Sequence, residues 1–291
     1  FAGTLEEMGL RELAAEAAAW TYGPAYLILD RSLSHIVEAL SRSVKVRTGW
    51  AVSRVEHSSS GGATLWSTDG RRVECDRVVV AAPLPTLRDG DIRFEPPLPA
   101  PKREALSRVR MGNALKVFFA FSERFWPEEL FDVVCPGCFL PEIWMTEYPA
   151  EAANTASPEP RGKYLITAFV GGRAADTMGL MPPETVIERS LAQLEEMFGP
   201  EARVRERLSG THIADWRRER FVRGAYTFPS LGAGDGARAA LAAPLESGRV
   251  FFAGEATHQG INPCMQAALE TGARAAAEVL ERMQAAPRSR M

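Results

Sequence analysis

The sequence predicts a mixed α/β fold, α+β in part, because two kinds of periodicity alternate along the chain. Short segments that alternate in polarity or are rich in β-branched residues, such as 51–57 and 78–82, predict strands. Longer segments with apolar residues every three to four positions, such as 183–198, predict helices. With 291 residues, 46 % of them hydrophobic, the chain can bury one large core or two smaller ones.

The first part of the chain predicts two helical segments and a β-meander. A Thr4-x-x-Glu7 capping box indicates a helix start near residue 1. Segment 30–42 carries a helical apolar stripe, with Asp30 or Ser32 as its N-cap. Strands are expected at 44–48, 51–57, 63–68, 72–75 and 78–82.

The middle of the chain predicts a second set of elements. The proline-rich stretch 96–101 cannot continue a helix or a strand ladder, so we expect a domain crossing there. Beyond it, 114–121 and 163–170 predict strands, and 183–198 predicts an amphipathic helix with proline in its first turn. Segment 154–162, rich in Pro, Ser and Ala, predicts a loop.

Composition excludes several classes of protein. A net charge of −3 with dispersed Lys and Arg gives no field that would attract nucleic acid, so no nucleic-acid partner is expected. No apolar run approaches the roughly 18 residues that a membrane span needs. The four cysteines are too few for a disulfide framework, which favours a reducing compartment and hence the cytoplasm.

The pair Cys135 and Cys138 invites a redox or zinc interpretation. A zinc site would need a second Cys or His pair, and a thioredoxin-like motif would open a helix after a strand. The sequence predicts neither context. We therefore favour a structural loop and expect no metal site.

The most informative segment is 248–257, where an apolar strand runs into a turn of small residues that carries one carboxylate. Gly254 allows a ligand to approach the backbone closely, and Glu255 offers two acceptors to sugar-type hydroxyls. A further helix, predicted to start about ten residues later, would point its first N–H groups at an anion. These features indicate a nucleotide cofactor.

This segment resembles the C-terminal FAD-binding motif of the flavin-containing amine oxidases, which include the monoamine and polyamine oxidases and their histone-demethylase relatives. Several further blocks match the family in family order and are together more specific than any one of them. The matches span roughly residues 27 to 282. The blocks are 77–83, 92–99, 114–121, 125–127, 216–221 and 224–226.

The resemblance implies a discontinuous FAD-binding domain of which one part is missing from the sequence. Flavin enzymes of this class hold the FAD pyrophosphate at a G-x-G-x-x-G turn, and no such glycine pattern occurs here. We therefore expect an incomplete two-domain FAD-dependent oxidase, with FAD-domain segments at 1–95 and 215–291 and an inserted substrate-binding domain at 96–214. The expected partner is an N-terminal FAD-binding segment or chain.

Lys116 is out of pattern on an apolar strand, where alternation places it on one face with Ala114 and Phe118. From the residues alone, a lysine snorkelling at a sheet edge is the better interpretation. The resemblance reverses this preference, because a lysine at this place in the family holds a water against flavin N5 and helps O2 to accept electrons. It implies that Lys116 is catalytic and that its pKa is lowered.

Trp216 and Tyr226 could be ordinary core aromatics. By resemblance, Trp216 lies near the flavin and Tyr226 is one wall of an aromatic cage for the substrate. The residue before that wall is a flavin-bonded cysteine in monoamine oxidases, and here it is Ala225. The resemblance therefore implies non-covalent FAD.

Cys264 stands where the family usually has the tyrosine that forms the opposite wall of the cage. This departure either widens the pocket for a bulkier substrate or indicates a substrate that is not a typical amine. A buried, inert thiol is an equally good interpretation. The backbone N–H of Met265 would face the flavin C2 carbonyl.

The remaining cofactor residues by resemblance are Val52, whose backbone would pair with the adenine edge, together with Gly254 and Glu255. From the sequence alone, Val52 is one more strand valine. His258 lies near the same segment, and we interpret it as a solvated loop histidine.

The sequence thus predicts FAD-dependent oxidation of an amine, with hydride transfer from a C–H next to nitrogen and reoxidation by O2 to hydrogen peroxide. It does not say whether the chain is active alone. Two alternatives stay open. One is a scaffold or regulatory chain that does not bind FAD, and the other is a different FAD oxidase or desaturase with the same C-terminal motif.

Overall fold

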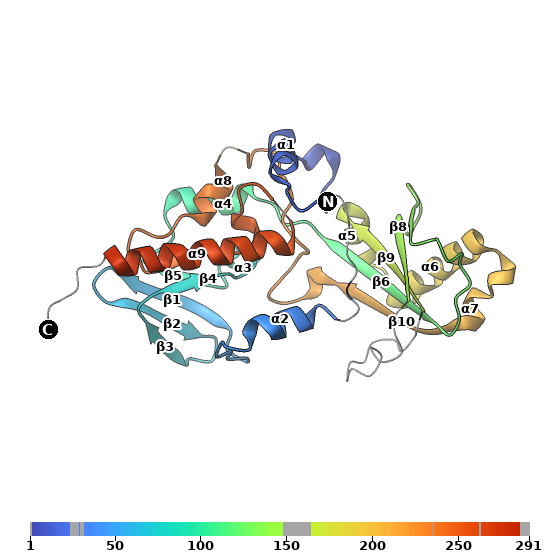
Figure 1. Ribbon diagram of the computed structural model, residues 1–291, viewed down its shortest axis with the longest axis horizontal. Coiled ribbons are helices and arrows are strands. Elements are labelled where there is room, and N and C mark those ends of the chain that lie inside the picture. The colour runs from blue at the N-terminus through green and yellow to red at the C-terminus, as the bar shows by residue number, and fades with distance from the viewer. Residues whose placement is uncertain are drawn as a thin grey trace. The chain divides into compact units, whose positions relative to one another are not determined.

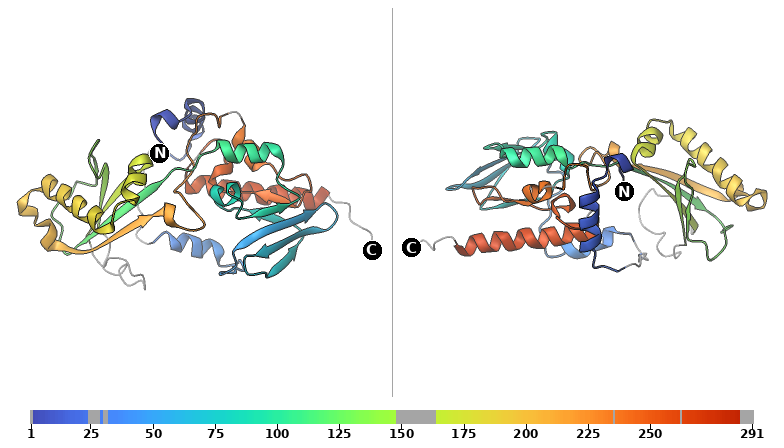
Figure 2. Two further views of the ribbon diagram at one scale, coloured as in Figure 1. Left: turned by 180° about the vertical axis from the view of Figure 1, so that it is seen from behind. Right: turned by 90° about the horizontal axis from the view of Figure 1, so that it is seen from above.

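The computed structural model describes residues 2–23, 29, 32–147, 164–234, 236–261 and 263–285 (Figures 1 and 2). Helices and strands are mixed along the chain, which confirms the predicted α/β class. The chain divides into two compact units. Unit 1 comprises Phe1–Gly23, Arg47–Gly112 and Arg217–Met291, and unit 2 comprises Pro24–Val46 and Asn113–Trp216.

Unit 1 contains a four-stranded sheet in the order β3-β2-β1-β5. The strands are β1 (Val52–Ser58), β2 (Gly62–Ser67), β3 (Arg72–Cys75) and β5 (Arg93–Glu95). β1 pairs antiparallel with β2 and parallel with β5. Gly62 has a φ of +88°, and a Cβ there would lie 2.7 Å from the Cys75 carbonyl oxygen, so this position requires glycine.

A second sheet of unit 1 joins segments that are far apart in the sequence. β4 (Val78–Val80) and β11 (Val250–Phe252) run parallel and side by side. All three residues of β11 are buried, which explains their uninterrupted apolar character. Phe252 packs against Phe94 of β5, so both sheets share one core.

Helices complete unit 1. The capping box is present, because Glu7 accepts the Thr4 backbone N–H at 3.0 Å, but it opens only a short 3-10 helix. The helices are η1 (Leu5–Glu7), α1 (Leu10–Ala19), α3 (Leu84–Arg88), α4 (Ala100–Arg108), α8 (Ala237–Ala242), η5 (Glu255–Thr257) and α9 (Met265–Ala285). No helix in the described ranges is long and apolar enough to cross a membrane.

Unit 2 is built on a five-stranded antiparallel sheet in the order β10-β6-β9-β8-β7. Its strands are β6 (Ala114–Phe121), β7 (Asp132–Val134), β8 (Glu142–Glu147), β9 (Tyr164–Gly171) and β10 (Leu208–Asp215). Its helices are α2 (Ser34–Ser41), α5 (Gly172–Gly179), α6 (Pro183–Phe198), η3 (Pro200–Ala202) and α7 (Val204–Arg207), and η4 (Trp216–Arg218) spans the boundary with unit 1. α5 and α6 pack on one face of the sheet, where Val117, Phe119 and Ile166 are fully buried.

The structure corrects the expected strand at 44–48. These residues form neither helix nor strand, and Val44 and Val46 are 61 % and 63 % exposed. β-branched residues favour a strand only where a neighbouring strand pairs with them. The preceding helix is shorter than predicted, and Ser32 accepts the Ser34 backbone N–H at 3.3 Å at its start. The alternative cap Asp30 and the loop 154–162 lie outside the described residues.

The proline-rich stretch 96–101 is also corrected, because it leads directly into α4. Pro99 is the N-cap of this helix, and Pro101 lies in its first turn, where no N–H is required. The larger segment of unit 2 starts at Asn113 and ends at Trp216. The assignment of FAD and substrate roles to segments of the chain stays a prediction.

Candidate functional site

Unit 1 contains the turn that the sequence links to a nucleotide cofactor. After β11 the chain reaches Gly254, which has a φ of +108°, a conformation that favours glycine. A Cβ at Gly254 would meet no atom within 4 Å, so the backbone is open on that side. Glu255 then begins η5. The turn has room for a ligand against the main chain.

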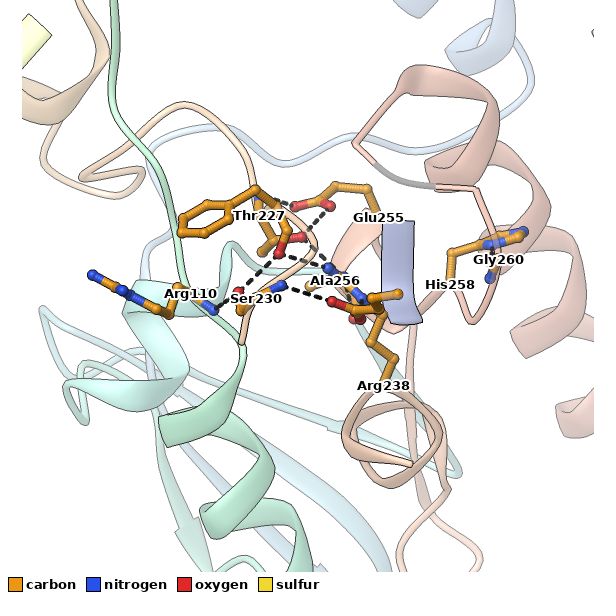
Figure 3. A network of polar contacts seen from close by, with 10 residues as sticks. Arg110, Thr227, Ser230, Arg238, Glu255, Ala256, His258 and Gly260 are labelled. Atoms are coloured by element: carbon orange, nitrogen blue, oxygen red, sulfur yellow. Dashed lines mark hydrogen bonds and ion pairs between the residues drawn. The ribbon is translucent and has the colours of Figure 1, made fainter. Parts of the chain in front are cut away.

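Glu255 turns its carboxylate towards Thr227 (Figure 3). The Thr227 backbone N–H donates to Oε1 at 3.1 Å, and the Thr227 hydroxyl donates to Oε2 at 2.6 Å. Burial raises the pKa of the Glu255 carboxyl, although these bonds and the charge of Arg238 oppose the rise. Each oxygen retains a second lone pair, which is the acceptor that a sugar hydroxyl needs.

Arg238 of α8 organises the polar groups behind Glu255 (Figure 3). It forms an ion pair with Glu12 of α1, both side chains being buried, and its Nη1 donates to the Thr227 hydroxyl oxygen at 3.0 Å. Glu12 also accepts the backbone N–H of Ser230 at 2.8 Å. Arg238 is held by Glu12 and in turn holds the Thr227 hydroxyl in position. Removing either member of the pair would leave the other charge buried and unpaired, which is strongly destabilising.

The start of α9 lies at the two residues predicted to face substrate and flavin. Cys264 precedes the helix, and its carbonyl accepts the backbone N–H of Ala268 at 3.3 Å. Burial raises the pKa of the Cys264 thiol, which lowers its thiolate content and disfavours a reactive role. Met265 is the first residue of α9, and its side chain is 54 % exposed. The roles of both residues stay predictions.

Glu16, also on α1, is a carboxylate that no sequence pattern singles out. Its Oε2 is buried and has no hydrogen-bond partner among the described residues. Burial raises the pKa of Glu16 to about 7, and the neighbouring carboxylate of Glu12 adds to the rise. Glu16 also acts on Cys264, whose pKa its negative charge raises.

His258 is bonded within the protein, so our interpretation of it as a solvated loop histidine is wrong. Its Nε2 lies 2.8 Å from a carboxylate oxygen of Glu270 on α9, and its Nδ1 accepts the Gly260 backbone N–H at 3.0 Å. The other oxygen of Glu270 accepts the hydroxyl of Tyr22. Because Nδ1 is an acceptor, the proton of the neutral ring lies on Nε2 and points at Glu270.

In unit 1, Val52 lies at the start of a strand, and Tyr226 lies in a loop. Val52 is half-buried at the start of β1. Tyr226 is half-buried, and its carbonyl accepts the backbone N–H of Gly112 at 2.8 Å. The backbone N–H of Ala225 donates to the Gly112 carbonyl, also at 2.8 Å. These two bonds fasten the segment that leaves unit 1 to the segment that re-enters it.

In unit 2, Lys116 lies on β6, an inner strand between β10 and β9. The alternative of a lysine snorkelling at a sheet edge therefore does not hold. Its Nζ lies 5.2 Å from the centroid of the Trp144 ring, and no ion pair reaches it from the described part of the chain. Burial lowers the pKa of Lys116, as a lysine with little water and no counter-ion requires.

The last sequence-predicted residues of unit 2 lie in less enclosed positions. Trp216 starts η4 and is 46 % exposed. Cys135 and Cys138 form a turn between β7 and β8, with the N–H of Cys138 donating to the Cys135 carbonyl at 3.1 Å. Both thiols are free, and the described ranges hold no group of three or more His, Cys, Asp or Glu side chains that could bind a metal.

The sequence model of the family described as flavin containing amine oxidoreductase matches residues 11–280. The chain belongs to this family. The resemblance stated from the sequence is thereby confirmed. The family consists of flavin-containing oxidoreductases that act on amines.

Relatives of several kinds are similar to this chain. It is 28 % identical to lysine-specific histone demethylase 1 homolog 1 of Arabidopsis thaliana, with 84 % of this chain and 28 % of that protein covered. It is 27 % identical to polyamine oxidase 3 of Oryza sativa subsp. japonica, with 88 % and 50 % covered. The structure of cyclohexylamine oxidase from Brevibacterium oxydans matches with a TM-score of 0.69 and 25 % identity over 86 % of this chain and 52 % of that one. The chain thus spans about half or less of the length of these relatives.

Thr227 and Arg238 are the site residues that sequence reasoning missed. Arg238 had a weak signal, since a charged residue within a run of alanines is out of pattern for a buried helix face. Thr227 had none, because its role depends on Glu255, which lies 28 residues further along the chain. Unit 1 gathers Gly254, Glu255 and Cys264 into one region of the chain, and unit 2 separately carries Lys116.

Proposed function

We propose that the chain provides the larger share of an FAD-dependent amine oxidase active site. The observation that carries the proposal is Lys116, a desolvated lysine on an inner strand that lacks a carboxylate partner among the described residues. Leaving a partly buried cation unpaired is costly, and such a position is typical of a group kept for chemistry. When bound, the flavin would accept a hydride from the substrate C–H next to nitrogen and pass the electrons to O2, giving hydrogen peroxide.

The residues of unit 1 fit one part of an FAD site. The open backbone at Gly254 leaves space for a ligand, and Glu255 offers lone pairs to a ribityl or ribose hydroxyl. The first N–H groups of the 21-residue helix α9, beginning at Met265, favour negative charge on a bound ring. We assign Val52 to the adenine edge and Trp216 to the neighbourhood of the flavin by family resemblance.

The role of Lys116 is electrostatic. A cation held in a site of low dielectric stabilises the negative charge that develops as O2 is reduced, and a lowered pKa lets it also hold or release a proton. Tyr226 would form one wall of the substrate site. Cys264 in place of the second aromatic wall would leave that side of the pocket wider.

Non-covalent binding of FAD follows from Ala225, which has no thiol to form a thioether. Acid precipitation of the loaded protein should release all of the flavin into the supernatant, measured by its absorbance. Flavin that stays in the protein pellet would contradict this part of the proposal. The free cysteines support a reducing compartment, and we place the protein in the cytoplasm as part of the same proposal.

A dinucleotide-binding segment has to complete the site, because the chain has no G-x-G-x-x-G turn to hold the pyrophosphate. The relatives described above are about twice as long as this chain or longer. This supports the proposal that residues other than 1–291 provide the dinucleotide-binding segment. It would be joined to this chain or provided as a separate one.

The test is a titration of FAD against the chain alone and against the chain mixed with an N-terminal dinucleotide-binding segment. We expect weak or no binding to the chain alone, and stoichiometric FAD with amine-dependent hydrogen peroxide release in the mixture. Stoichiometric FAD on the chain alone would contradict the need for the segment. A colourless mixture would favour a scaffold or regulatory role instead, for which the inward-turned carboxylate of Glu255 is the supporting observation.

A further inference from the structure

The loop that joins β7 to β8 in unit 2 holds two cysteines in one turn. Cys135 and Cys138 are its first and last residues, and the N–H of Cys138 donates to the Cys135 carbonyl at 3.1 Å. Pro136 at the second position and Gly137, with a φ of +81°, at the third are the residues that a type II turn favours. Such a turn holds its outer Cα atoms within about 7 Å of each other, and a disulfide needs a similar separation.

The rest of the loop keeps this turn in place. The Cys135 backbone N–H donates to the Pro141 carbonyl at 2.7 Å, next to the last strand pair of β7 and β8. Gln193 of α6 bonds the backbone of Leu140 twice, accepting its N–H at 2.8 Å and donating to its carbonyl at 3.0 Å. The Leu140 side chain is fully buried. The fold therefore holds the two cysteines next to each other in the folded chain.

The two thiols contact each other but differ in exposure. Cys135 is half-buried, Cys138 is exposed, and their side chains share a hydrogen bond. Burial raises the pKa of the Cys135 thiol, and the charge and hydrogen bond of Cys138 add to the rise. A raised pKa lowers the content of thiolate, which is the reactive form. An oxidant dissolved in water therefore reaches Cys138 first, with Cys135 beside it.

We propose that Cys135 and Cys138 are a redox pair that hydrogen peroxide converts reversibly into a disulfide. The Cys138 thiolate attacks one peroxide oxygen, the O–O bond breaks, and the departing hydroxide takes up a proton to become water. This leaves a sulfenic acid on Cys138. The Cys135 sulfur then attacks the Cys138 sulfur, so that the S–S bond forms, the S–O bond breaks and a second water leaves. The two thiols are oxidised and the peroxide is reduced to two waters.

The length of the loop makes this disulfide easy to reduce. A disulfide stabilises a protein largely by closing a loop, and the gain is smallest for short loops. Only Pro136 and Gly137 separate the two cysteines. A dithiol reductant should therefore restore both thiols. The inference does not rest on the proposed function, although that function would release the same oxidant.

The test adds hydrogen peroxide to the purified, fully reduced chain without flavin. We expect two of the four thiols to disappear. The peptide that contains Cys135 and Cys138 should become lighter by two hydrogen atoms in the mass spectrum, and dithiothreitol should reverse both changes. Cys75→Ser, which removes a half-buried cysteine of unit 1, is the matched control and should leave this disulfide unaffected. Because no flavin is present, failure of the proposed function would not alter the result.

Two single variants test the order of the steps. In Cys135→Ser, peroxide should leave a sulfenic acid on Cys138, which dimedone labels. In Cys138→Ser, labelling of Cys135 should be about 10-fold lower, because that thiol is less exposed and forms less thiolate. Equal labelling of the two variants would overturn the assigned order.

Three results in the wild type would overturn the redox pair itself. They are retention of all four thiols, a disulfide between two chains in place of the internal one, and sulfinic acid at Cys138 without loss of the two hydrogen atoms. A bond that dithiothreitol leaves intact would contradict its reversibility. Loss of the two hydrogen atoms from the Cys135–Cys138 peptide, reversed by dithiothreitol, supports the proposal.

Discussion

Two lysines, one in each unit, have lost most of their water, and they differ in what replaces it. Lys102 of α4 is buried, and its Nζ donates to the carbonyls of Ala240 and Leu241 at 2.8 and 2.7 Å. It also lies 3.7 Å from the centroid of the Phe252 ring. Lys116 of β6 lies against the ring of Trp144, and no described residue accepts a hydrogen bond from its Nζ.

The difference separates a lysine with a structural role from one for which we propose a functional role. Burial lowers the pKa of both, so a shifted pKa alone does not distinguish them. A neutral amine has two N–H groups, and those of Lys102 are satisfied by the two carbonyls at the end of α8. The N–H groups of Lys116 remain for a water or a ligand. Hydrogen-bond satisfaction is therefore the better guide to function.

The largest expected effect is on chemistry at Lys116. In the reconstituted oxidase, Lys116→Met should slow reoxidation of the reduced flavin by O2 by about 10² to 10³, because a fixed cation stabilises the developing negative charge. FAD affinity and stability should change little. Stopped-flow measurement of the two half-reactions provides the test, with Lys45→Met, an exposed lysine, as the matched control. An unchanged oxidative rate would remove Lys116 from the catalytic site.

The next effect is on stability at Lys102. Lys102→Met leaves two carbonyls without their donor and should lower the free energy of unfolding by about 1–3 kcal/mol, measured by urea denaturation. Lys45→Met again serves as control. If Lys116→Met destabilised the chain as much as Lys102→Met does, the distinction between the two lysines would be lost.

The pH dependence of Lys102 sharpens the same comparison. Folding lowers its pKa from 10.5 to about 7, so between these pH values the unfolded chain binds more protons than the folded one. The contribution of Lys102 to stability therefore rises with pH from about 7 upwards. The unfolding free energy of wild type minus that of Lys102→Met should grow between pH 7 and pH 10, and a flat difference would contradict the shift.

The smallest effect concerns Glu16, whose buried Oε2 has no hydrogen-bond partner in the part of the chain that the structure describes. Folding raises its pKa from 4.5 to about 7, so the folded chain binds more protons in this window and stability falls as pH rises through it. Glu16→Gln should therefore stabilise the chain by about 1 kcal/mol at pH 8 and by little at pH 5. Thermal unfolding at both values is the measurement, with the exposed Glu281→Gln as control.

Local patterns predicted the elements whose stability is local. The helix Pro183–Phe198 agrees with its apolar period, and β6 coincides with the predicted strand 114–121. β5 was missed, because three residues carry no period and its pairing with β1 joins distant segments. The proline-rich stretch 96–101 does not predict α4, because prolines usually break a helix, although the first turn of a helix tolerates them.

The candidate site was predictable where one residue broke a pattern. Lys116 on an apolar strand and Gly254 before a carboxylate are such positions. The aromatic pair of Trp144 and Phe169 was not predictable, since it exists only through the register of β8 with β9. In the same way Thr227 reaches Glu255 only after a long loop has closed. Sequence patterns report single residues, whereas pairs across strands and loops depend on the tertiary fold.

Two backbone hydrogen bonds join Gly112 to the segment 225–226, so the segment that leaves unit 1 and the segment that returns to it are paired. The chain leaves unit 1 after Gly112 and re-enters it at Arg217. Because Gly112 is bonded to residues 225 and 226, the two ends of the inserted segment 113–216 are held close together. The cost of closing such a loop grows only slowly with its length. We therefore expect unit 1 to tolerate insertions and deletions within residues 113–216. Under the proposed function, residues 113–216 would be able to vary in substrate preference while unit 1 keeps its part of the cofactor site.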